Sequence, residues 1–366
     1  RGAAVLVTNG RYAAGECRGS DGSTNRVVVN KPLILRSVDG PKSTVIDGNG
    51  KMRCIYLATG AILSGFTLAN GSAWNGGGVY AEPWACVITN CLLAGNWARE
   101  WGGGAYGGTL HNCTSIGNSA YAGGGASESI LYDCTVTGNS AGSGGGAWES
   151  TLYNCTLRGN SANEYGGGAA GSTLYNCTLT RNSAELVSGG AAGGTLYNCI
   201  VCFNEAPYGP NYYDAAMNYC CTTPLPTNGI GNIDADPRFV NAPAGDFRLL
   251  PDSPCIDAGT NLTDIVSTDI VGLSRPLDGD GDGVARFDIG AYEFNPYRFV
   301  RLVFDQFAFK FTIQGEPGRL VRLEQSRDLV NWEEAAVVPL PASGQTLFDA
   351  GAMMEPHQFY RAVSLY

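Results

Sequence analysis

The middle of the chain carries short apolar runs in a repeating order. Within residues 151–160 (Thr-Leu-Tyr-Asn-Cys-Thr-Leu-Arg-Gly-Asn), polar residues separate the apolar Leu152, Cys155 and Leu157, and Asn154 occupies a turn position. This spacing is typical of strands and not of helices. The pattern predicts very short strands joined by Gly and Asn turns, with these three side chains pointing inward.

The pattern returns every 21 or 22 residues. Six cysteines mark successive copies, at Cys91, Cys113, Cys134, Cys155, Cys177 and Cys199. A period this short cannot enclose a core of its own, so each copy must stack on its neighbours and share one. Three short strands in each period predict a parallel β-helix whose coils rise by about 4.8 Å.

Stacked coils place equivalent residues above one another as ladders. Asparagine suits such ladders because it tolerates left-handed backbone angles and its amide can bond to the next amide. We expect two of them, formed by Asn90, Asn112, Asp133, Asn154, Asn176 and Asn198, and by Asn96, Asn118, Asn139, Asn160, Asn182 and Asn204. We expect an apolar ladder at Leu110, Ile130, Leu152, Leu174 and Leu196, beside the ladder of six cysteines.

The chain has thirteen cysteines. Ladder cysteines with parallel side chains about 4.8 Å apart are poorly placed for disulfides, so we expect them to be buried and reduced. The remaining ones are Cys17, Cys54, Cys86, Cys202, Cys220, Cys221 and Cys255. Because Cys199 and Cys202 should point to opposite faces, a disulfide from Cys202 to Cys220 or Cys221 is favoured over a zinc site.

Two motifs carry a resemblance to known proteins. Gly-Gly-Gly-Ala followed by Leu-Tyr-Asn-Cys-Thr-Leu-x-x-Asn resembles the right-handed β-helix repeat proteins of bacterial surfaces, and is similar to the repeats of polymorphic outer-membrane proteins. Residues 62–68 (Ile-Leu-Ser-Gly-Phe-Thr-Leu) with Asn70 resemble a coil of pectate-lyase-like folds. The resemblance implies an all-β, right-handed parallel β-helix of about nine or more coils, located extracellularly or on a bacterial cell surface. It leaves activity open, because this fold hosts lyases, hydrolases, adhesins and inert stalks.

The organisation changes along the chain. We expect the β-helix over residues 1–295, with N-terminal coils or a cap at 1–50, regular repeats at 51–204, and the last coils and a C-terminal cap at 205–295. Residues 296–366 lose glycine and gain alternating aromatic residues, which predicts a small β-sandwich. This module is expected either to bind sugar or to act as a spacer, with Trp332 in its core.

Charge narrows the choice of partners. The net charge is -10, which argues against nucleic acid or an anionic membrane surface. No apolar run is long enough to span a bilayer. We expect a monomer whose partner is a polysaccharide or a cell-surface glycan.

Candidate chemistry lies where the repeat varies, after each Gly-Gly-Gly-Ala. Glu128 and Glu149 would stack on adjacent coils about 5 Å apart, close to the roughly 5–5.5 Å between the two carboxylates of retaining glycoside hydrolases. Mutual repulsion would then keep a proton on one of them. The candidate substrate-binding aromatics are Tyr106, Trp148, Trp101, Tyr121 and Tyr165. Strand alternation places Tyr106 and Trp148 on the face opposite the two acids unless a bulge intervenes.

These residues support two functions. In the first, the chain is a carbohydrate-binding or carbohydrate-active protein, with a glycoside hydrolase or polysaccharide lyase activity. In the second, it is a non-catalytic adhesin or stalk, and the same residues are solvated turn residues. Uniform coils without long loops favour the second function, whereas aromatic turn residues and the appended module favour the first.

A calcium site is predicted after the repeats. In residues 278–283 (Asp-Gly-Asp-Gly-Asp-Gly), carboxylates alternate with glycines that permit a tight turn. The expected ligands are Asp278, Asp280, Asp282 and Asp288. Ile289 occupies the position of the closing glutamate of an EF-hand, so the loop is not a true EF-hand. The alternative is a solvated acidic turn.

Overall fold

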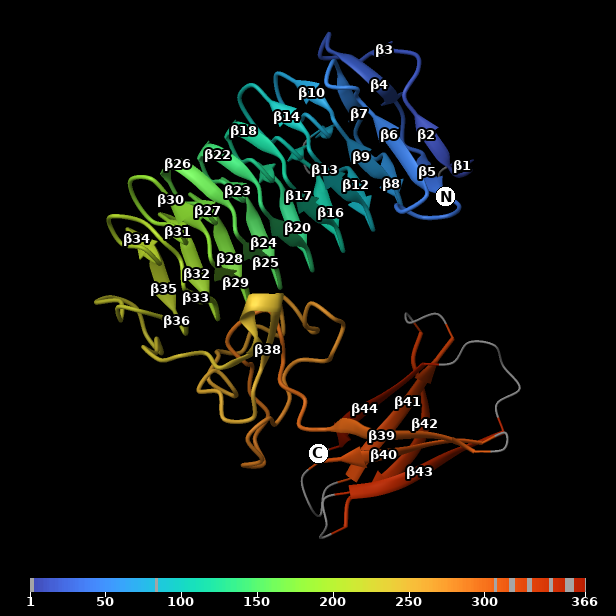
Figure 1. The fold of residues 1–366 in the computed structure, drawn as a ribbon, viewed down its shortest axis with the longest axis vertical. Coiled ribbons are helices and arrows are strands. Elements are labelled where there is room, and N and C mark those ends of the chain that lie inside the picture. The colour runs from blue at the N-terminus through green and yellow to red at the C-terminus, as the bar shows by residue number, and fades with distance from the viewer. Residues whose placement is uncertain are drawn as a thin grey trace.

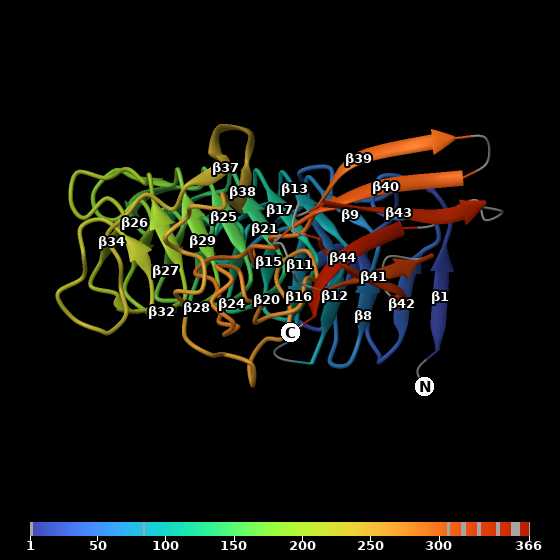
Figure 2. The same ribbon diagram turned by 90° about the horizontal axis from the view of Figure 1, so that it is seen from below.

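The computed structural model of the chain describes residues 3–82, 85–305, 308–315, 320–327, 331–341, 345–352 and 359–365. They form a long parallel β-helix, an irregular segment and a small antiparallel C-terminal module (Figure 1). Figure 2 shows the coils following one another along a single axis. Within these ranges, no helix has the length and apolar character needed to cross a membrane.

Three long sheets, named A, B and C, and a shorter sheet D form the β-helix. Sheet A contains, in spatial order, β1 (Ala4–Val7), β5 (Ile34–Ser37), β8 (Ile62–Ser64), β12 (Val87–Thr89), β16 (Thr109–His111), β20 (Ile130–Tyr132), β24 (Thr151–Tyr153), β28 (Thr173–Tyr175), β32 (Thr195–Tyr197) and β35 (Ala216–Asn218). Sheet B contains β2 (Gly10–Tyr12), β6 (Thr44–Asp47), β9 (Thr67–Ala69), β13 (Leu92–Ala94), β17 (Thr114–Ile116), β21 (Thr135–Thr137), β25 (Thr156–Arg158), β29 (Thr178–Thr180), β33 (Ile200–Cys202) and β36 (Cys221–Thr222).

Sheet C contains β3 (Cys17–Arg18), β4 (Thr24–Val29), β7 (Arg53–Leu57), β11 (Val79–Ala81), β15 (Ala105–Tyr106), β19 (Ala126–Ser127), β23 (Ala147–Trp148), β27 (Ala169–Ala170), β31 (Ala191–Ala192) and β34 (Tyr212–Tyr213). Sheet D contains β10 (Ser72–Ala73), β14 (Trp97–Ala98), β18 (Ser119–Ala122), β22 (Ser140–Ser143), β26 (Ser161–Tyr165) and β30 (Ser183–Ala184). A regular coil therefore visits C, A, B and D in turn. The predicted parallel β-helix is confirmed.

The core lies between the sheets and is continuous from coil to coil. Leu152, Cys155 and Leu157 are fully buried, as the strand pattern predicts. One ladder prediction is wrong: Leu131, and not Ile130, pairs with Leu110 and Leu152. Ile130 instead stands in the half-exposed threonine column, where its hydrophobicity conceals its place in the repeat.

The two predicted asparagine ladders are confirmed, and they have different roles. Members of the first, such as Asn112 and Asn154, have a φ near 50° and make the turn between sheets A and B. Members of the second are buried and bond to each other. The Asn160 Oδ1 accepts hydrogen bonds from the Asn139 backbone N–H and side-chain amide, both at 3.0 Å, and its Nδ2 donates to Asn182 Oδ1 at 2.9 Å.

The triple glycines make the bend from sheet D into sheet C. Gly102 has a φ of 66°, and a Cβ atom on Gly103 would lie 2.5 Å from the Ser119 carbonyl oxygen of the next coil. Only glycine fits where successive backbones approach this closely. The bend delivers each coil to the first strand of sheet C in the same register.

All thirteen cysteines are free, and every one except Cys17 is buried. The thiol ladder is confirmed, and Cys220 extends it. Burial raises the pKa of the ladder thiols Cys91 to Cys199 well above its usual range. Cys199 faces the core while Cys202 lies on the outer face with Cys221 and Cys255, so the expected facing is correct. The predicted disulfide from Cys202 is not formed.

After Thr222 the chain leaves the coils and folds back beside them. The segment includes β37 (Phe239–Asn241), a 3-10 turn at Ala242–Ala244 and β38 (Asp246–Leu249). Asn154 and Asn198 each donate a side-chain hydrogen bond of 2.8 Å to its backbone, at Thr268 and Thr260. Residues 205–295 thus supply a coil made of β34, β35 and β36, and a segment that folds back beside the later coils.

The C-terminal module consists of two three-stranded antiparallel sheets. One contains β39 (Arg298–Asp305), β40 (Ala308–Gln314) and β43 (Gln345–Ala352), and the other contains β42 (Glu333–Pro339), β41 (Leu320–Ser326) and β44 (Phe359–Leu365). Ile313 from the first sheet and Val321 and Leu323 from the second share a buried core. The small all-β module is therefore present as predicted.

The buried asparagine ladder leads to a stability prediction. Asn160→Ala removes four side-chain hydrogen bonds, of which two are to Asn139, one to Val136 and one to Asn182. The partner atoms are buried, so water cannot replace these hydrogen bonds. We expect it to lower the free energy of unfolding by roughly 2–4 kcal/mol. The exposed neighbour Asn163→Ala is the control and should change it by less than about 0.5 kcal/mol. Urea unfolding measures both, and equal losses would contradict the role given to the ladder.

Candidate functional site

An aromatic column runs along the outer face of sheet C. Strand register aligns Tyr56, Tyr80 and Tyr106 on successive coils, followed by Ser127 and then Trp148. The ring centroids of Tyr56 and Tyr80 are 5.6 Å apart, and those of Tyr80 and Tyr106 are 5.2 Å apart. The column is therefore continuous over three coils, interrupted for one coil, and resumed at Trp148.

Aromatic residues before the triple glycines join this column from the side. The Trp101 ring lies 6.1 Å from that of Tyr106, and the Tyr165 ring lies 5.9 Å from that of Trp148. Trp101 and Tyr165 are exposed. Four of the five predicted aromatics thus form two neighbouring pairs. Tyr121 is 61% exposed on β18 and is part of neither pair.

The two predicted acids occupy equivalent positions on adjacent coils, directly after β19 and β23. Glu128 and Glu149 are exposed, follow equivalent strand ends and have φ values of 50° and 45°. The expectation that they face away from the aromatics is wrong for Glu128, because the Tyr106 hydroxyl donates a 3.0 Å hydrogen bond to its Oε2. The left-handed backbone ends the strand alternation at this residue. Burial, together with this hydrogen bond, raises the pKa of Tyr106.

Ser127 lies where the aromatic column is interrupted. Its side chain occupies the register position of Tyr106 and Trp148, yet the residue is fully buried. Among the described residues its hydroxyl has no hydrogen-bond partner. The column thus contains an unsatisfied polar group between two rings that belong to coils two steps apart.

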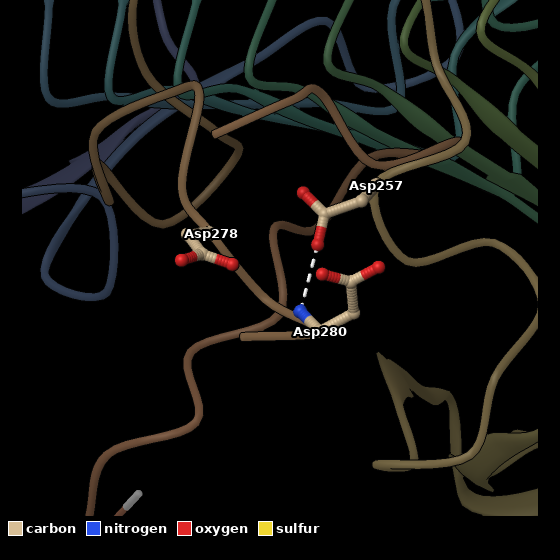
Figure 3. A group of neighbouring side chains, drawn as sticks. All are labelled: Asp257, Asp278 and Asp280. Atoms are coloured by element: carbon tan, nitrogen blue, oxygen red, sulfur yellow. Dashed lines mark hydrogen bonds between the residues drawn. The ribbon is translucent and has the colours of Figure 1, made fainter. Parts of the chain in front are cut away.

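A second candidate site is the acidic loop after the repeats. Asp257, Asp278 and Asp280 each offer a carboxylate oxygen, and these oxygens lie within 4.8 Å of one another (Figure 3). The Asp257 Oδ2 also accepts backbone hydrogen bonds from Gly279 at 2.8 Å and Asp280 at 2.7 Å. Asp257 was not among the predicted ligands, because it comes from a separate stretch that only the fold brings to the loop.

The other two predicted ligands lie elsewhere. Asp282 pairs at the surface with Arg286 at 2.8 Å. Asp288 is buried, and its Oδ1 accepts a 2.8 Å hydrogen bond from the Asp257 backbone N–H. The sequence motif therefore identifies the loop and two members of its carboxylate group, but not the complete set.

Asp288 belongs to a buried group of charges. Asp269, Asp288 and Glu293 are almost fully buried around a single buried cation, Arg275, whose Nε lies 3.4 Å from Glu293 Oε2. Burial raises the pKa of all three acids, and that of Glu293 rises to about 7. The sequence offered no signal for this group, since its members are separated by ordinary loop residues.

A cavity lies between the folded-back segment and the C-terminal module. It measures about 1000 Å³, and its lining includes Tyr292, Trp332 and Arg361. Trp332 was expected in the core of the C-terminal module. The structure instead places it half-buried in the lining of this cavity. The Arg361 guanidinium lies 4.3 Å from the centre of the Trp332 ring and covers one of its faces. Trp332 is therefore not a free platform on that side.

The chain was compared with protein-family models and with curated proteins. No protein-family model matches this chain, and no match is found among the curated proteins.

The buried acids lead to a pH prediction. Glu293 has a pKa near 4.3 when unfolded and about 7 when folded, so the folded state binds the proton more tightly. This stabilisation is complete below the unfolded pKa and is lost as the pH rises through 7. We expect the free energy of unfolding to fall by on the order of 2 kcal/mol between about pH 5 and about pH 8. Glu293→Gln should flatten the profile measured by urea unfolding, and the exposed Glu185→Gln should not. A profile that rises over this range would contradict the assignment.

Proposed function

We propose that the outer face of sheet C binds a polysaccharide or cell-surface glycan, in a pectate-lyase-like protein that acts outside the cell or on a bacterial surface. The observation that carries this proposal is the part of the aromatic column that reaches the surface, at Tyr80, Tyr106 and Trp148, widened by Trp101 and Tyr165. Sugar rings expose apolar C–H faces that pack on aromatic rings, while their hydroxyls need polar partners at the rim.

The interruption at Ser127 is the proposed position of one sugar ring. Tyr106 and Trp148 lie two coil steps apart, or roughly 9–10 Å at the strand spacing of a sheet. Ser127 between them is fully buried, so the polar group that reaches the surface at this point is the exposed Glu128 carboxylate. A pyranose there would have an aromatic ring on each side and the Glu128 carboxylate as a partner for its hydroxyls.

Hydrolysis by Glu128 and Glu149 is the catalytic form of this proposal. Their equivalent positions on adjacent coils agree with the spacing that a retaining mechanism uses. The alternative is a non-catalytic adhesin or stalk. It is favoured by the exposure of both carboxylates, since a general acid normally has its pKa raised by burial.

The binding proposal predicts a loss of affinity when the rings are removed. Tyr106→Ala and Trp148→Ala should each weaken binding to a retained glycan by about tenfold, which corresponds to about 1.4 kcal/mol. Tyr12→Ala, an exposed tyrosine on sheet B, is the matched control. Affinity electrophoresis against a panel of polysaccharides measures the effect, and equal retention of all three variants would count against this face.

The catalytic form makes a separate prediction. If the pair is catalytic, incubation with a bound glycan releases new reducing ends, and Glu128→Gln and Glu149→Gln each lower the rate at least about a hundredfold. Activity that is unchanged in both variants would remove the pair. A polysaccharide that binds but releases no ends would leave the adhesin or stalk alternative.

We also propose a structural calcium ion at Asp257, Asp278 and Asp280. Three clustered carboxylates offer the hard oxygen donors that Ca²⁺ prefers, although some of these oxygens already accept backbone N–H groups. Water would complete the coordination. Burial is the main cause that raises the pKa of Asp257, and the negative charge of Asp280 raises it further. A bound ion would offset the repulsion between these two carboxylates.

Calcium binding is expected to raise the melting temperature. Asp278→Asn should abolish the calcium-dependent rise, because it removes one of the three carboxylates. Asp282→Asn should preserve it, because Asp282 pairs with Arg286 at the surface. Calorimetry with and without chelator measures both variants, and a wild-type chain with neither heat of binding nor a rise would rule out the ion.

A further inference from the structure

On the premise that the face proposed above binds a glycan, we infer that this glycan carries no acidic groups. The inference rests on the distribution of charge around the aromatic column. Glu128 and Glu149 stand beside it, and Glu100 and Glu164 directly precede Trp101 and Tyr165. Acidic residues therefore occur both directly after the strands of the column and in the segments just before the triple glycines.

Cations are nearly missing from this part of the chain. Between residues 54 and 237 the sequence has no lysine, and its arginines stand at 99, 158 and 181. Arg158, in sheet B, donates a 2.8 Å hydrogen bond to the Pro243 carbonyl on the folded-back segment, and Arg181 follows a strand of the same sheet. Arg99 precedes Trp101 by two residues, and its guanidinium is 4.3 Å from the centre of the Trp74 ring.

At the N-terminal end of sheet C, Arg18 on β3 is exposed and donates a 3.3 Å hydrogen bond to the Gly22 carbonyl; β4, β7 and β11 separate it from the strand of Tyr106. The Arg53 side chain is fully buried beneath Tyr80, where its NH1 pairs with Asp21 at 2.9 Å. Glu82, at the same end, accepts hydrogen bonds from the Tyr56 hydroxyl and from Thr59. These hydrogen bonds lower the pKa of Glu82, so it is a carboxylate at neutral pH.

Electrostatic repulsion from these carboxylates would weaken the binding of an acidic glycan to this face. Coils are about 4.8 Å apart, and charges closer than the Debye length of about 10 Å at 0.1 M salt act together. A polyuronate or sulfated chain lying along the column would place its own charges beside the row of carboxylates, with no counter-charge to pair them. The aromatic rings, by contrast, recognise the apolar C–H faces that uncharged sugars also have.

The inference is tested with four glycans and two salt concentrations. The intact chain is measured by isothermal titration against a neutral glucan, an amine-bearing chain, a polyuronate and a sulfated chain. Salt of about 10 mM and about 300 mM changes the Debye length from about 30 Å to about 6 Å. We expect an acid-free chain to bind, and the acidic chains to bind at least about tenfold more weakly at low salt. High salt should narrow this difference.

Charge removal supplies the matched comparison. The double variant Glu128→Gln with Glu149→Gln should raise the affinity for the acidic chains relative to the acid-free one at low salt. Glu333→Gln, on β42 of the C-terminal module, is the control and should change nothing. Acidic chains that bind as tightly as the neutral chain at low salt, or that weaken with added salt, would overturn the inference while leaving the glycan-binding face intact. If none of the four binds, the proposed function itself fails.

Discussion

The β-helix depends on hydrogen bonding between one coil and the next. Each strand has only two or three residues in most regular coils, so it has little stability of its own. Backbone ladders in four sheets and the chain of side-chain amides from Asn96 to Asn204 connect the coils along the axis. Because each buried amide uses its donors and its acceptor on its neighbours, the register of every coil is fixed by the coil beside it.

That register is what creates the candidate site. A residue at one position of the repeat appears again one coil later, so a variable position becomes a column on the surface. Tyr56, Tyr80, Tyr106 and Trp148 are far apart in the sequence and become neighbours only through strand pairing in sheet C. Equivalent surface residues of such a fold therefore form columns that run along its axis. A chain-like ligand matches these columns better than a compact one.

Most of the regular coils could be predicted from the sequence, because the inward-facing and turn positions repeat. The aromatic residues and the two acids could also be named from the sequence, because they stand at positions of the repeat that vary from copy to copy. The hydrogen bond between Tyr106 and Glu128 was not predictable, because it depends on the left-handed backbone at Glu128. Likewise, Asp257 joins Asp278 and Asp280 only through the path of the folded-back segment, which has no period from which contacts could be inferred.

The folded-back segment has a mechanical consequence. It bonds to Asn154 and Asn198, and Leu262, Val266 and Phe287 cover Tyr153, Tyr175 and Tyr197, so it acts as a brace across the later coils. Coils of a solenoid otherwise touch only their neighbours and can fray from either end. Braced coils must open together, whereas unbraced ones can peel singly. Under tension the N-terminal coils would consequently yield first, and the braced half would be the last part to come apart.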